Sequence, residues 1–346
     1  MKDTIVISGT HLTPALALAE KLTGYRVIYL GKKIPSPRFS RHRPLISLLS
    51  LVKLPFGLIK ARALLLKYRP VLVLSFGGYS AVPVGLAAVS LKIPLVLHEQ
   101  TMKAGLANRL LAPLALKIAV SWPQSQNYFP RHKVVLTGNP IRSQLLKAAK
   151  KHLTSTISHQ PSIYITGGNQ GSRTINLVLT PLLPRLLARY RVIHQFGLNQ
   201  SRSDWNKQVR FKAGLPRKLV QNYRLKRWFE TGEVGQILNR ADLVVSRAGI
   251  NTVVELALFG KKAVLIPHPK AQKNEQQQNA LFLKKHFGAR VIEQNRLTRE
   301  KLLDAITMML KTKPHRPSTI YQLPASFITD GADRLYQLVK SVCEKA

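Results

Sequence analysis

The chain has 346 residues, 45% of them hydrophobic and 20% charged, a composition typical of a globular protein with two domains. Its one cysteine, Cys343, excludes an intrachain disulfide framework and a thiolate zinc site, and it fits a reducing cytosol. No apolar run reaches the ~18–20 residues that a membrane-spanning helix needs, and the first apolar stretch is too short for a signal peptide.

Positive charge is the unusual property of the composition. The chain carries 54 lysines and arginines against 15 acidic residues, a formal net charge of +39. Within residues 1–200 the only acids are Asp3, Glu20 and Glu99. Such a field attracts polyanions, which include nucleic acid, an anionic membrane surface and phosphorylated substrates. Adaptation of a whole proteome to its cytoplasm produces the same excess, so charge alone does not choose among these.

In the first half of the chain, short apolar strands alternate with helices. We predict strands over residues 4–8, 25–30, 71–75 and 94–98, and a helix over residues 14–22. The strands are almost wholly apolar, as expected of a parallel sheet that is covered on both faces. The first half therefore predicts a doubly wound α/β domain.

The same pattern starts again after a polar stretch. Residues 147–160 lack strand periodicity and are interpreted as part of a linker. Further strands are predicted over residues 163–166, 191–195, 241–246 and 262–267. The fold class is therefore α/β, with two Rossmann-like doubly wound domains. In such proteins ligands bind beyond the carboxyl ends of the strands, and here also in a cleft between the domains.

One segment, residues 44–66, is densely apolar, is interrupted by Pro55 and Gly57, and carries basic residues. It is too interrupted to cross a bilayer. It is suited to lie on one, with apolar side chains in the interface and cations at anionic head groups. The alternative is a buried pair of helices under basic surface residues, and the sequence leaves both open.

Glycine-rich turns follow two predicted strands, at residues 165–173 and 76–80. Glycine allows close approach of the backbone to an anion, and a following helix presents free N–H groups. The first turn is therefore a candidate cradle for a diphosphate or a sugar. Glycine also serves ordinary tight turns. The spacing matches neither a P-loop nor the dinucleotide fingerprint.

A third turn, residues 247–255, leads from a strand into a helix that we expect to start near Asn251 or Thr252, both good N-cap residues. Glu255 then lies about one turn into the helix, where a carboxylate accepts hydrogen bonds from ribose hydroxyls. The alternative is a capping carboxylate without a ligand. The amide-rich run that starts at Gln276 suits sugar hydroxyls, although a solvated loop explains it equally well.

Two further candidates lie near predicted strand ends. Glu99 follows His98 and is the only acid between Glu20 and Asp204, so it is either paired or functional. The segment Gly138 to Arg142 lies at the domain junction, where an arginine is able to reach a diphosphate. We find no His, Cys or Asp spacing typical of a metal site and no G-x-S-x-G motif.

Together these motifs resemble the MurG family of glycosyltransferase family 28, which transfers N-acetylglucosamine to lipid I to form lipid II in peptidoglycan synthesis. The resemblance runs from about residue 4 to Arg334. The matching motifs are GGYSAVPVGLAA (77–88), LHEQ (97–100), AGLANR (104–109), GNPIR (138–142), GGNQGSRTIN (167–176), SRAGINTVVELALFGKKAVLIP (246–267) and QQQNA (276–280).

The resemblance implies a GT-B fold and an inverting transfer without a bound metal ion or other cofactor. It implies an acceptor domain over residues 1–143, a linker over 144–160, a UDP-sugar domain over 161–327 and a last helix over 328–346 that crosses back to the first domain. The partners would be UDP-N-acetylglucosamine and an undecaprenyl-diphosphate-linked acceptor, with no nucleic acid. The protein would be peripheral on the cytoplasmic face of the cell membrane, bound through the region from Leu48 to Ile59 and nearby basic residues.

Site residues carry over by motif. On the donor side the resemblance implies Arg142, Gly168, Asn169, Gln170, Phe229, Asn251, Thr252, Glu255 and Gln276. On the acceptor side it implies Thr10, Gly77, Gly78, Tyr79, His98, Glu99, Thr101 and Asn108, with His11 as the candidate catalytic base. Glu255 would hold the ribose, Arg142 and the loop 167–171 the diphosphate, Gln276 the sugar, and the backbone near Phe229 the uracil.

The chain departs from the family pattern on the acceptor side. Its first loop lacks two glycines before His11, and Thr101 stands where the family has asparagine. Three alternatives follow: a related glycosyltransferase with another lipid-linked acceptor, a UDP-sugar 2-epimerase of the same architecture, and a nucleic-acid-binding α/β protein. The apolar basic segment and the acceptor motifs argue against the second, and the lack of an aromatic-basic platform argues against the third.

Overall fold

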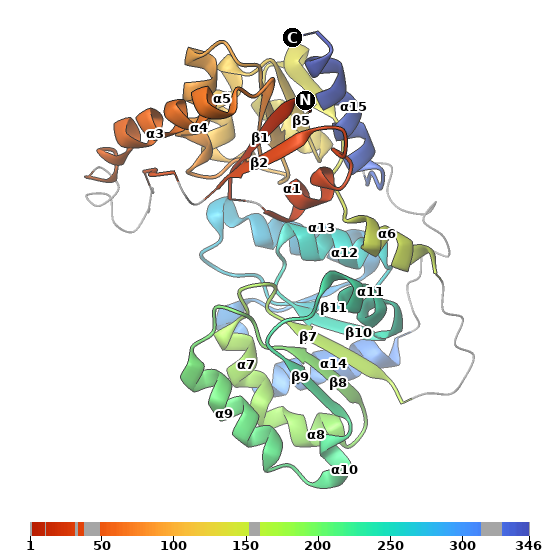
Figure 1. The fold of residues 1–346 in the computed structure, drawn as a ribbon. Coiled ribbons are helices and arrows are strands. Elements are labelled where there is room, and N and C mark those ends of the chain that lie inside the picture. The colour runs from red at the N-terminus through yellow and green to blue at the C-terminus, as the bar shows by residue number, and fades with distance from the viewer. Residues whose placement is uncertain are drawn as a thin grey trace. The chain divides into compact units, whose positions relative to one another are not determined.

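The computed structural model describes residues 2–10, 12–31, 34–37, 49–151, 160–312 and 327–345. The chain forms two compact units. We call them the N-terminal unit, residues 1–143 with 325–346, and the C-terminal unit, residues 144–324. Each contains one parallel sheet with helices on its faces (Figure 1). The expected α/β class with two doubly wound sheets is confirmed.

The sheet of the N-terminal unit has the strand order β2-β1-β3-β4-β5-β6. Its strands are β1 Thr4–Ser8, β2 Arg26–Leu30, β3 Leu72–Ser75, β4 Leu95–Glu99, β5 Lys117–Val120 and β6 Val134–Leu136. Its helices are α1 Leu12–Ala19, α3 Lys53–Tyr68, α4 Ala81–Ser90, α5 Leu106–Leu111 and α15 Gly331–Cys343, with short 3-10 helices at Ala112–Leu114, Pro123–Tyr128 and Arg131–Lys133.

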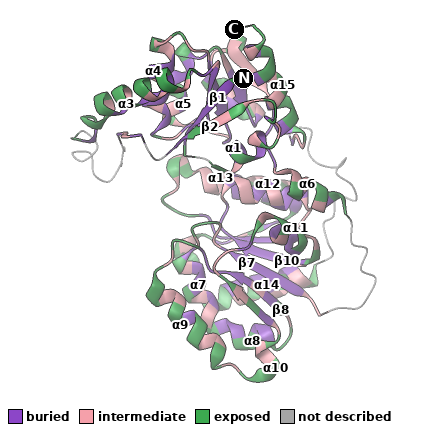
Figure 2. Cartoon of the chain, viewed as in Figure 1, coloured by how far each residue is buried: buried purple, intermediate pink, exposed green. Residues whose placement is uncertain are grey.

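Two separate cores cover the faces of this sheet. Val6 and Val73 belong to a core with α3, α4 and α5, whereas Ile5 and Leu74 belong to a core with α1 and α15. Neighbouring residues of one strand serve opposite cores because side chains alternate across a sheet. Figure 2 shows the central strands buried and the outer sides of the helices exposed. This explains why the strands are apolar along their whole length.

The sheet of the C-terminal unit has the strand order β12-β11-β10-β7-β8-β9. Its strands are β7 Ser162–Thr166, β8 Arg191–Gln195, β9 Tyr223–Lys226, β10 Leu243–Ser246, β11 Ala263–Leu265 and β12 Arg290–Val291. Its helices are α7 Arg173–Leu179, α8 Leu183–Leu187, α9 Arg202–Ala213, α10 Arg217–Val220, α11 Thr231–Arg240, α12 Ile250–Leu258, α13 Glu275–Phe287 and α14 Arg299–Lys311, with 3-10 turns at Thr180–Leu182, Gln272–Asn274 and Gln294–Arg296.

The direction of winding reverses once in each sheet. In the N-terminal unit β1 lies between β2 and β3, and in the C-terminal unit β7 lies between β8 and β10. Counted from its own first strand, the second sheet has the strand order of a dinucleotide-binding Rossmann sheet. At such a reversal the loops that leave neighbouring strands diverge and open a crevice at the carboxyl ends. The three predicted glycine turns follow β3, β7 and β10.

Part of the segment that we expected to be a linker, residues 144–160, is helical. Helix α6, Ser143–Lys150, buries Leu145 and Ala149, and the side-chain amide of Asn239 donates to the carbonyl oxygen of Ala148 at 2.6 Å. The two buried residues are one helical turn apart, and the lysines between and after them concealed this spacing. Residues 152–159 lie outside the described residues.

The apolar segment contains a continuous helix, contrary to the expectation that Pro55 and Gly57 interrupt it. Helix α3 begins at Lys53, so Pro55 falls in its first turn, where the missing N–H of proline costs no helical hydrogen bond. A Cβ at Gly57 would lie 2.0 Å from the carbonyl oxygen of Pro35, so glycine allows a close approach here. Residues 38–48, including Leu48, lie outside the described residues.

Candidate active site

The loops after β1 and β3 pack directly against each other in the N-terminal unit. The N–H of Thr10 donates to the carbonyl oxygen of Gly77 at 3.1 Å. Gly9 has a φ of +125°, and a Cβ on it would lie 2.6 Å from the same oxygen. A Cβ on Gly78, whose φ is +85°, would lie 2.1 Å from the hydroxyl of Thr10. Glycine is therefore required at both positions by backbone conformation and by contact.

Glu99 holds the loop that follows β4. Its carboxylate is buried and accepts hydrogen bonds from the backbone N–H and hydroxyl of Thr101, the N–H of Gly105 and the amide of Asn108, at 2.6 to 3.0 Å. Asn108 also donates to the carbonyl oxygen of His98 at 3.1 Å. Glu99 is thus paired with neutral donors inside its own loop. The geometry makes Glu99 a support for the loop after β4.

The remaining acceptor-side residues occupy different environments. His98 is fully buried, with its Nε2 atom 3.3 Å from the hydroxyl of Ser121, and its ring lies beside Phe76. Tyr79 is 38% exposed at the start of the segment that leads into α4. Of these two, Tyr79 is the one with surface available to a ligand. His11, the candidate base, lies outside the described residues.

In the C-terminal unit the loop 167–171 follows β7. Gly168 has a φ of +78°, and no atom lies within 4 Å of a Cβ built on it, so its backbone borders open space. The N–H of Gly171 donates to the carbonyl oxygen of Gly168 at 3.1 Å and closes the turn. The side chains of Asn169 and Gln170 are exposed. The loop therefore leaves open space beside Gly168 and exposes the side-chain amides of Asn169 and Gln170.

Helix α12 begins earlier than we predicted. Its N-cap is Gly249 rather than Asn251 or Thr252, which lie in the first turn, and no side chain caps it. No atom lies within 4 Å of a Cβ built on Gly249, so open space lies beside the N-cap, and the first N–H groups of a helix have no acceptor within the helix. Glu255 is half-buried on the same helix. The uncapped start of α12 therefore lies directly after the loop that follows β10.

Two buried side chains hold that loop in place. Arg247 donates to the carbonyl oxygen of Ile266 at 3.0 Å and to the side chain of Gln294 at 2.6 Å. Burial lowers the pKa of Arg247 to about 10, so it stays charged at neutral pH. Asn279 donates to the carbonyl oxygen of Ala248 at 3.1 Å. The last residue of the QQQNA motif's amide run is therefore structural.

Gln276 lies in the first turn of α13, where its Oε1 atom accepts a hydrogen bond from the N–H of His268 at 2.9 Å. This hydrogen bond fixes the orientation of the amide. Its oxygen is occupied, so its nitrogen is the atom available to a sugar hydroxyl. Phe229 is buried, and its N–H donates to the side chain of Gln195 at 3.2 Å. Gln195, the last residue of β8, was missed by the sequence analysis. The available signal was its position at a strand end, two residues before Gly197.

Arg142 lies in the N-terminal unit, at the end of the GNPIR segment. Gly138 in this segment has a φ of +84°, and a Cβ on it would lie 2.5 Å from the Cβ atom of Ile328. A Cβ on Gly331 would lie 2.7 Å from the carbonyl oxygen of Asn139. The segment therefore packs closely against the residues that precede and begin α15. Arg142, its last residue, is half-buried.

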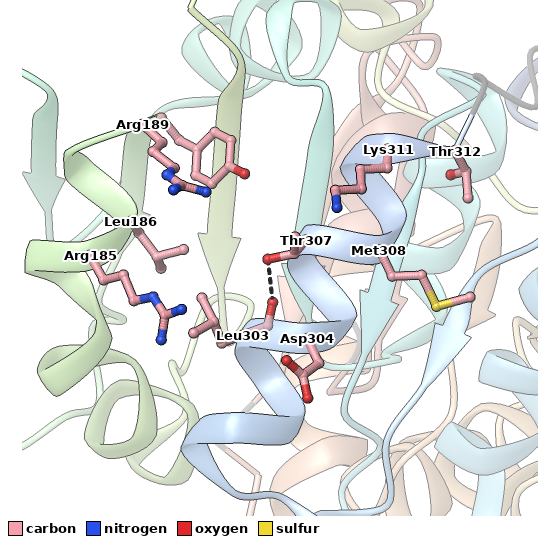
Figure 3. Close-up of a pocket in the computed structure, with 10 residues that line it drawn as sticks. Arg185, Leu186, Arg189, Leu303, Asp304, Thr307, Met308, Lys311 and Thr312 are labelled. Atoms are coloured by element: carbon pink, nitrogen blue, oxygen red, sulfur yellow. Dashed lines mark hydrogen bonds between the residues drawn. The ribbon is translucent and has the colours of Figure 1, made fainter.

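A separate groove of about 560 Å³ lies between α8 and α14 (Figure 3). Its wall includes Tyr190, which directly precedes β8, and Thr312, whose carbonyl oxygen accepts a hydrogen bond from Lys262, the residue before β11. It therefore lies at the amino ends of the strands, away from the loops described above. In the ranges that the structure describes, no group of three His, Cys, Asp or Glu side chains is arranged to hold a metal ion.

The two sheets and the glycine-lined loops at their reversals define a protein of the two-domain Rossmann-like α/β class. Residues 34–120 match the glycosyltransferase family 28 N-terminal domain, and residues 162–335 match the glycosyltransferase family 28 C-terminal domain. The chain belongs to glycosyltransferase family 28 and is a glycosyltransferase.

Relatives of nearly equal length support this assignment. Proteins from Desulfotalea psychrophila and Lachnospira eligens are each named UDP-N-acetylglucosamine–N-acetylmuramyl-(pentapeptide) pyrophosphoryl-undecaprenol N-acetylglucosamine transferase. The first is 30% identical, over 98% of this chain and 95% of its own. The second is 31% identical, over 98% of this chain and 99% of its own.

Solved structures show the same architecture. The crystal structure of Acinetobacter baumannii MurG has a TM-score of 0.69 and 25% identity, over 99% of this chain and 100% of its own. A UDP-GlcNAc 2-epimerase from Methanocaldococcus jannaschii has a TM-score of 0.61 but only 12% identity, over 99% of this chain and 100% of its own. The likeness to the epimerase is one of fold alone.

Proposed function

We propose that the chain transfers N-acetylglucosamine from UDP-N-acetylglucosamine to the 4-hydroxyl of the muramyl-peptide on undecaprenyl diphosphate, the step from lipid I to lipid II. The observation that carries the proposal is the similarity, over almost the whole chain, to relatives whose name describes this transfer. The acceptor oxygen attacks the anomeric carbon, the bond from that carbon to UDP breaks with inversion, and a base takes the hydroxyl proton.

The C-terminal unit binds the donor in this proposal. The diphosphate lies in the open space beside Gly168 of the loop 167–171 and contacts the exposed side chains of Asn169 and Gln170. Glu255 accepts hydrogen bonds from the ribose hydroxyls, with Asn251 and Thr252 in the same helix. These groups follow β7 and β10, two neighbouring strands. The loops that leave such strands diverge at the carboxyl ends, where ligands bind to sheets of this kind.

The remaining donor-side contacts are made to the N-acetylglucosamine hydroxyls, the uracil ring and the diphosphate. The amide nitrogen of Gln276 binds the sugar hydroxyls, because its oxygen is occupied by His268. The carbonyl oxygen of Phe229 accepts from uracil, because its N–H is occupied by Gln195. Arg142 stabilises the charge of the departing UDP, as a guanidinium does for a diphosphate.

The N-terminal unit binds the acceptor diphosphate through Thr10, Gly77, Gly78 and Tyr79. His98, Glu99, Thr101 and Asn108 act there by holding the backbone, because they hydrogen-bond to neighbouring groups of the same unit. His11 is the proposed base. We expect His11→Ala to lower kcat by about 100-fold, since general base catalysis contributes at least that factor, with the affinity for UDP unchanged. An unaltered kcat would remove His11 from the mechanism.

For location we propose peripheral binding to the cytoplasmic face of the cell membrane. Leu49, Val52, Phe56, Ile59 and Leu66 are 56% to 72% exposed along and just before α3. Three to four residues separate most of them, so they share one face of the helix, and the same helix carries exposed lysines and an arginine. Among the described residues, no helix combines the length and apolar character needed to cross a bilayer.

The decisive experiment measures turnover of UDP-N-acetylglucosamine with a lipid I analogue, with and without a chelator. We expect a product with one added N-acetylglucosamine and the same rate in both conditions. UDP-N-acetylmannosamine formed without acceptor would instead indicate a 2-epimerase. Loss of turnover in the chelator would refute the metal-independent mechanism while leaving the transfer itself in place.

A further inference from the structure

Gln195 makes four hydrogen bonds with its side-chain amide. Its Nε2 atom donates to the carbonyl oxygen of Gly168 at 3.2 Å and to the hydroxyl of Thr166 at 3.1 Å. Its Oε1 atom accepts from the N–H of Phe229 at 3.2 Å and from the hydroxyl of Tyr164 at 3.4 Å. The residue is 3% exposed. A glutamine amide offers two donor hydrogens and two acceptor lone pairs, so its capacity is used completely.

The partners determine which way the amide points. The carbonyl oxygen of Gly168 only accepts and the N–H of Phe229 only donates, so Nε2 must face the first and Oε1 the second. The side chain therefore connects two backbone segments in one defined orientation. These segments are the loop after β7 and the segment after β9, and Gln195 lies on β8 between them.

The contact with Gly168 fixes the open part of the loop. The carbonyl oxygen of Gly168 accepts from both Gln195 and the N–H of Gly171, and the N–H of Gly168 donates to the hydroxyl of Thr166 at 3.0 Å. Both polar groups of this glycine are thus held from inside the unit. Because glycine has no side chain to restrain it and faces open space here, its conformation depends on these bonds.

We propose that Gln195 is a positioning residue that holds the diphosphate loop and the backbone of Phe229 in one fixed relation, so that the phosphates and the base of the donor are bound together. Gln195 touches no substrate in this proposal, which rests on the proposed donor site. Without it, the two segments would have to be ordered separately on binding, and the affinity for UDP would fall.

Two variants and a matched control test the proposal. Gln195→Leu removes all four hydrogen bonds. Gln195→Glu keeps an acceptor oxygen for the N–H of Phe229, but it replaces the donor to Gly168 by a carboxylate oxygen, which repels the carbonyl oxygen of Gly168. Gln208 is the control, because it is 4% exposed in the same unit and its side-chain amide bonds to Tyr223 and Thr180. Gln208→Leu therefore reproduces the loss of a buried amide away from the loop.

The measurements are calorimetric binding of UDP and of uridine, and steady-state KM values for donor and acceptor. We expect Gln195→Leu to weaken UDP binding and raise the donor KM about tenfold, the effect of losing a buried hydrogen bond, with the acceptor KM within about twofold. Gln195→Glu should weaken UDP more than uridine, because uridine has no diphosphate. Gln208→Leu should leave both affinities within about twofold.

The outcomes separate this inference from the proposed function. UDP binding by the folded Gln195→Leu and Gln195→Glu variants within twofold of the original protein would overturn it, and so would an equal loss in Gln208→Leu. If Gln195→Leu does not fold, the ratio of UDP to uridine affinity in Gln195→Glu decides, and an unchanged ratio overturns the proposal. Failure of the original protein to bind UDP would instead refute the donor site itself.

Discussion

The hydroxyl of Tyr29 donates a hydrogen bond to the carbonyl oxygen of Gly9, which joins β2 to the loop after β1. Burial raises the pKa of this hydroxyl, so it stays protonated and able to donate. A Cβ at Gly31 would lie 2.3 Å from the Tyr29 ring, so glycine makes room for it. The first loop lacks two glycines that the family has before His11, and here a tyrosine from the next strand supports the shortened loop.

We expect Tyr29→Phe to raise the KM for the acceptor about fivefold, because it removes one partly buried hydrogen bond to the loop. The donor KM should not change, since Tyr29 lies in the N-terminal unit. Tyr25→Phe is the control, because its hydroxyl bonds to Cys343 instead. Equal acceptor KM values for the two variants would show that the Tyr29 bond does not support acceptor binding.

Glu255→Ala should raise the donor KM at least about tenfold, because a carboxylate that accepts from both ribose hydroxyls contributes charge-assisted hydrogen bonds. Calorimetry with UDP-N-acetylglucosamine measures the loss directly, and circular dichroism checks the fold. Glu300→Ala, at the exposed start of α14, is the control acid. Donor affinity that survives Glu255→Ala would move the ribose site elsewhere.

The exposed face of α3 should bind anionic vesicles. Replacing Phe56 and Ile59 by serine should reduce pelleting with phosphatidylglycerol vesicles about tenfold or more, because each side chain contributes about 1.5–3 kcal/mol when buried in an apolar phase. The matched control replaces Val209 and Met308, which are 42% and 52% exposed on the C-terminal unit. High salt should weaken binding by the original protein. Equal pelleting of both double variants would locate the membrane contact outside α3.

His194 should make stability fall in acid. Its Nε2 atom lies 3.0 Å from the side-chain oxygen of Asn176 and its Nδ1 atom 2.8 Å from the hydroxyl of Tyr223. Burial lowers the pKa of His194 from 6.5 to about 3. The unfolded chain therefore binds a proton that the folded chain does not, and the stabilisation present above pH 6.5 is lost as the pH falls towards 3.

Urea unfolding between pH 7.5 and pH 5 measures this effect. The contribution of His194 approaches about 1.4 kcal/mol per pH unit below its ordinary pKa. The variant His194→Gln should lack this part of the slope while retaining the part that comes from carboxylates. Parallel slopes in the two proteins would contradict a neutral buried histidine.

Much of the fold followed from local patterns. Each strand predicted in the first half, at residues 4–8, 25–30, 71–75 and 94–98, corresponds to an observed strand. Four short or polar strands, β5, β6, β9 and β12, were not predicted. β9, Tyr-Arg-Leu-Lys, alternates apolar and basic residues over only four positions, and β12 has two residues, so both are too short for a clear periodic signal. They form because neighbouring strands present a free edge to them.

The candidate site likewise has features that the sequence indicates and features that only the folded structure shows. Glycine turns, the acid of α12 and the amide run were recognisable because residue type and spacing already express their chemistry. Only the folded structure shows that Glu99 supports its loop, that Asn279 bonds to the backbone of Ala248 and that Gly249 is the N-cap of α12. Each depends on which groups a folded backbone leaves unpaired, and residue type does not show that.

The sequence by itself determined the α/β class, the family and the donor-side motifs, because apolar periodicity and glycine spacing are local properties of a chain. Tertiary structure alone decided that Gln195 joins the loop of Gly168 to the backbone of Phe229 and that Tyr29 supports the loop after β1. These contacts bring together residues 20 to 34 positions apart, on strands whose neighbours are chosen by sheet topology.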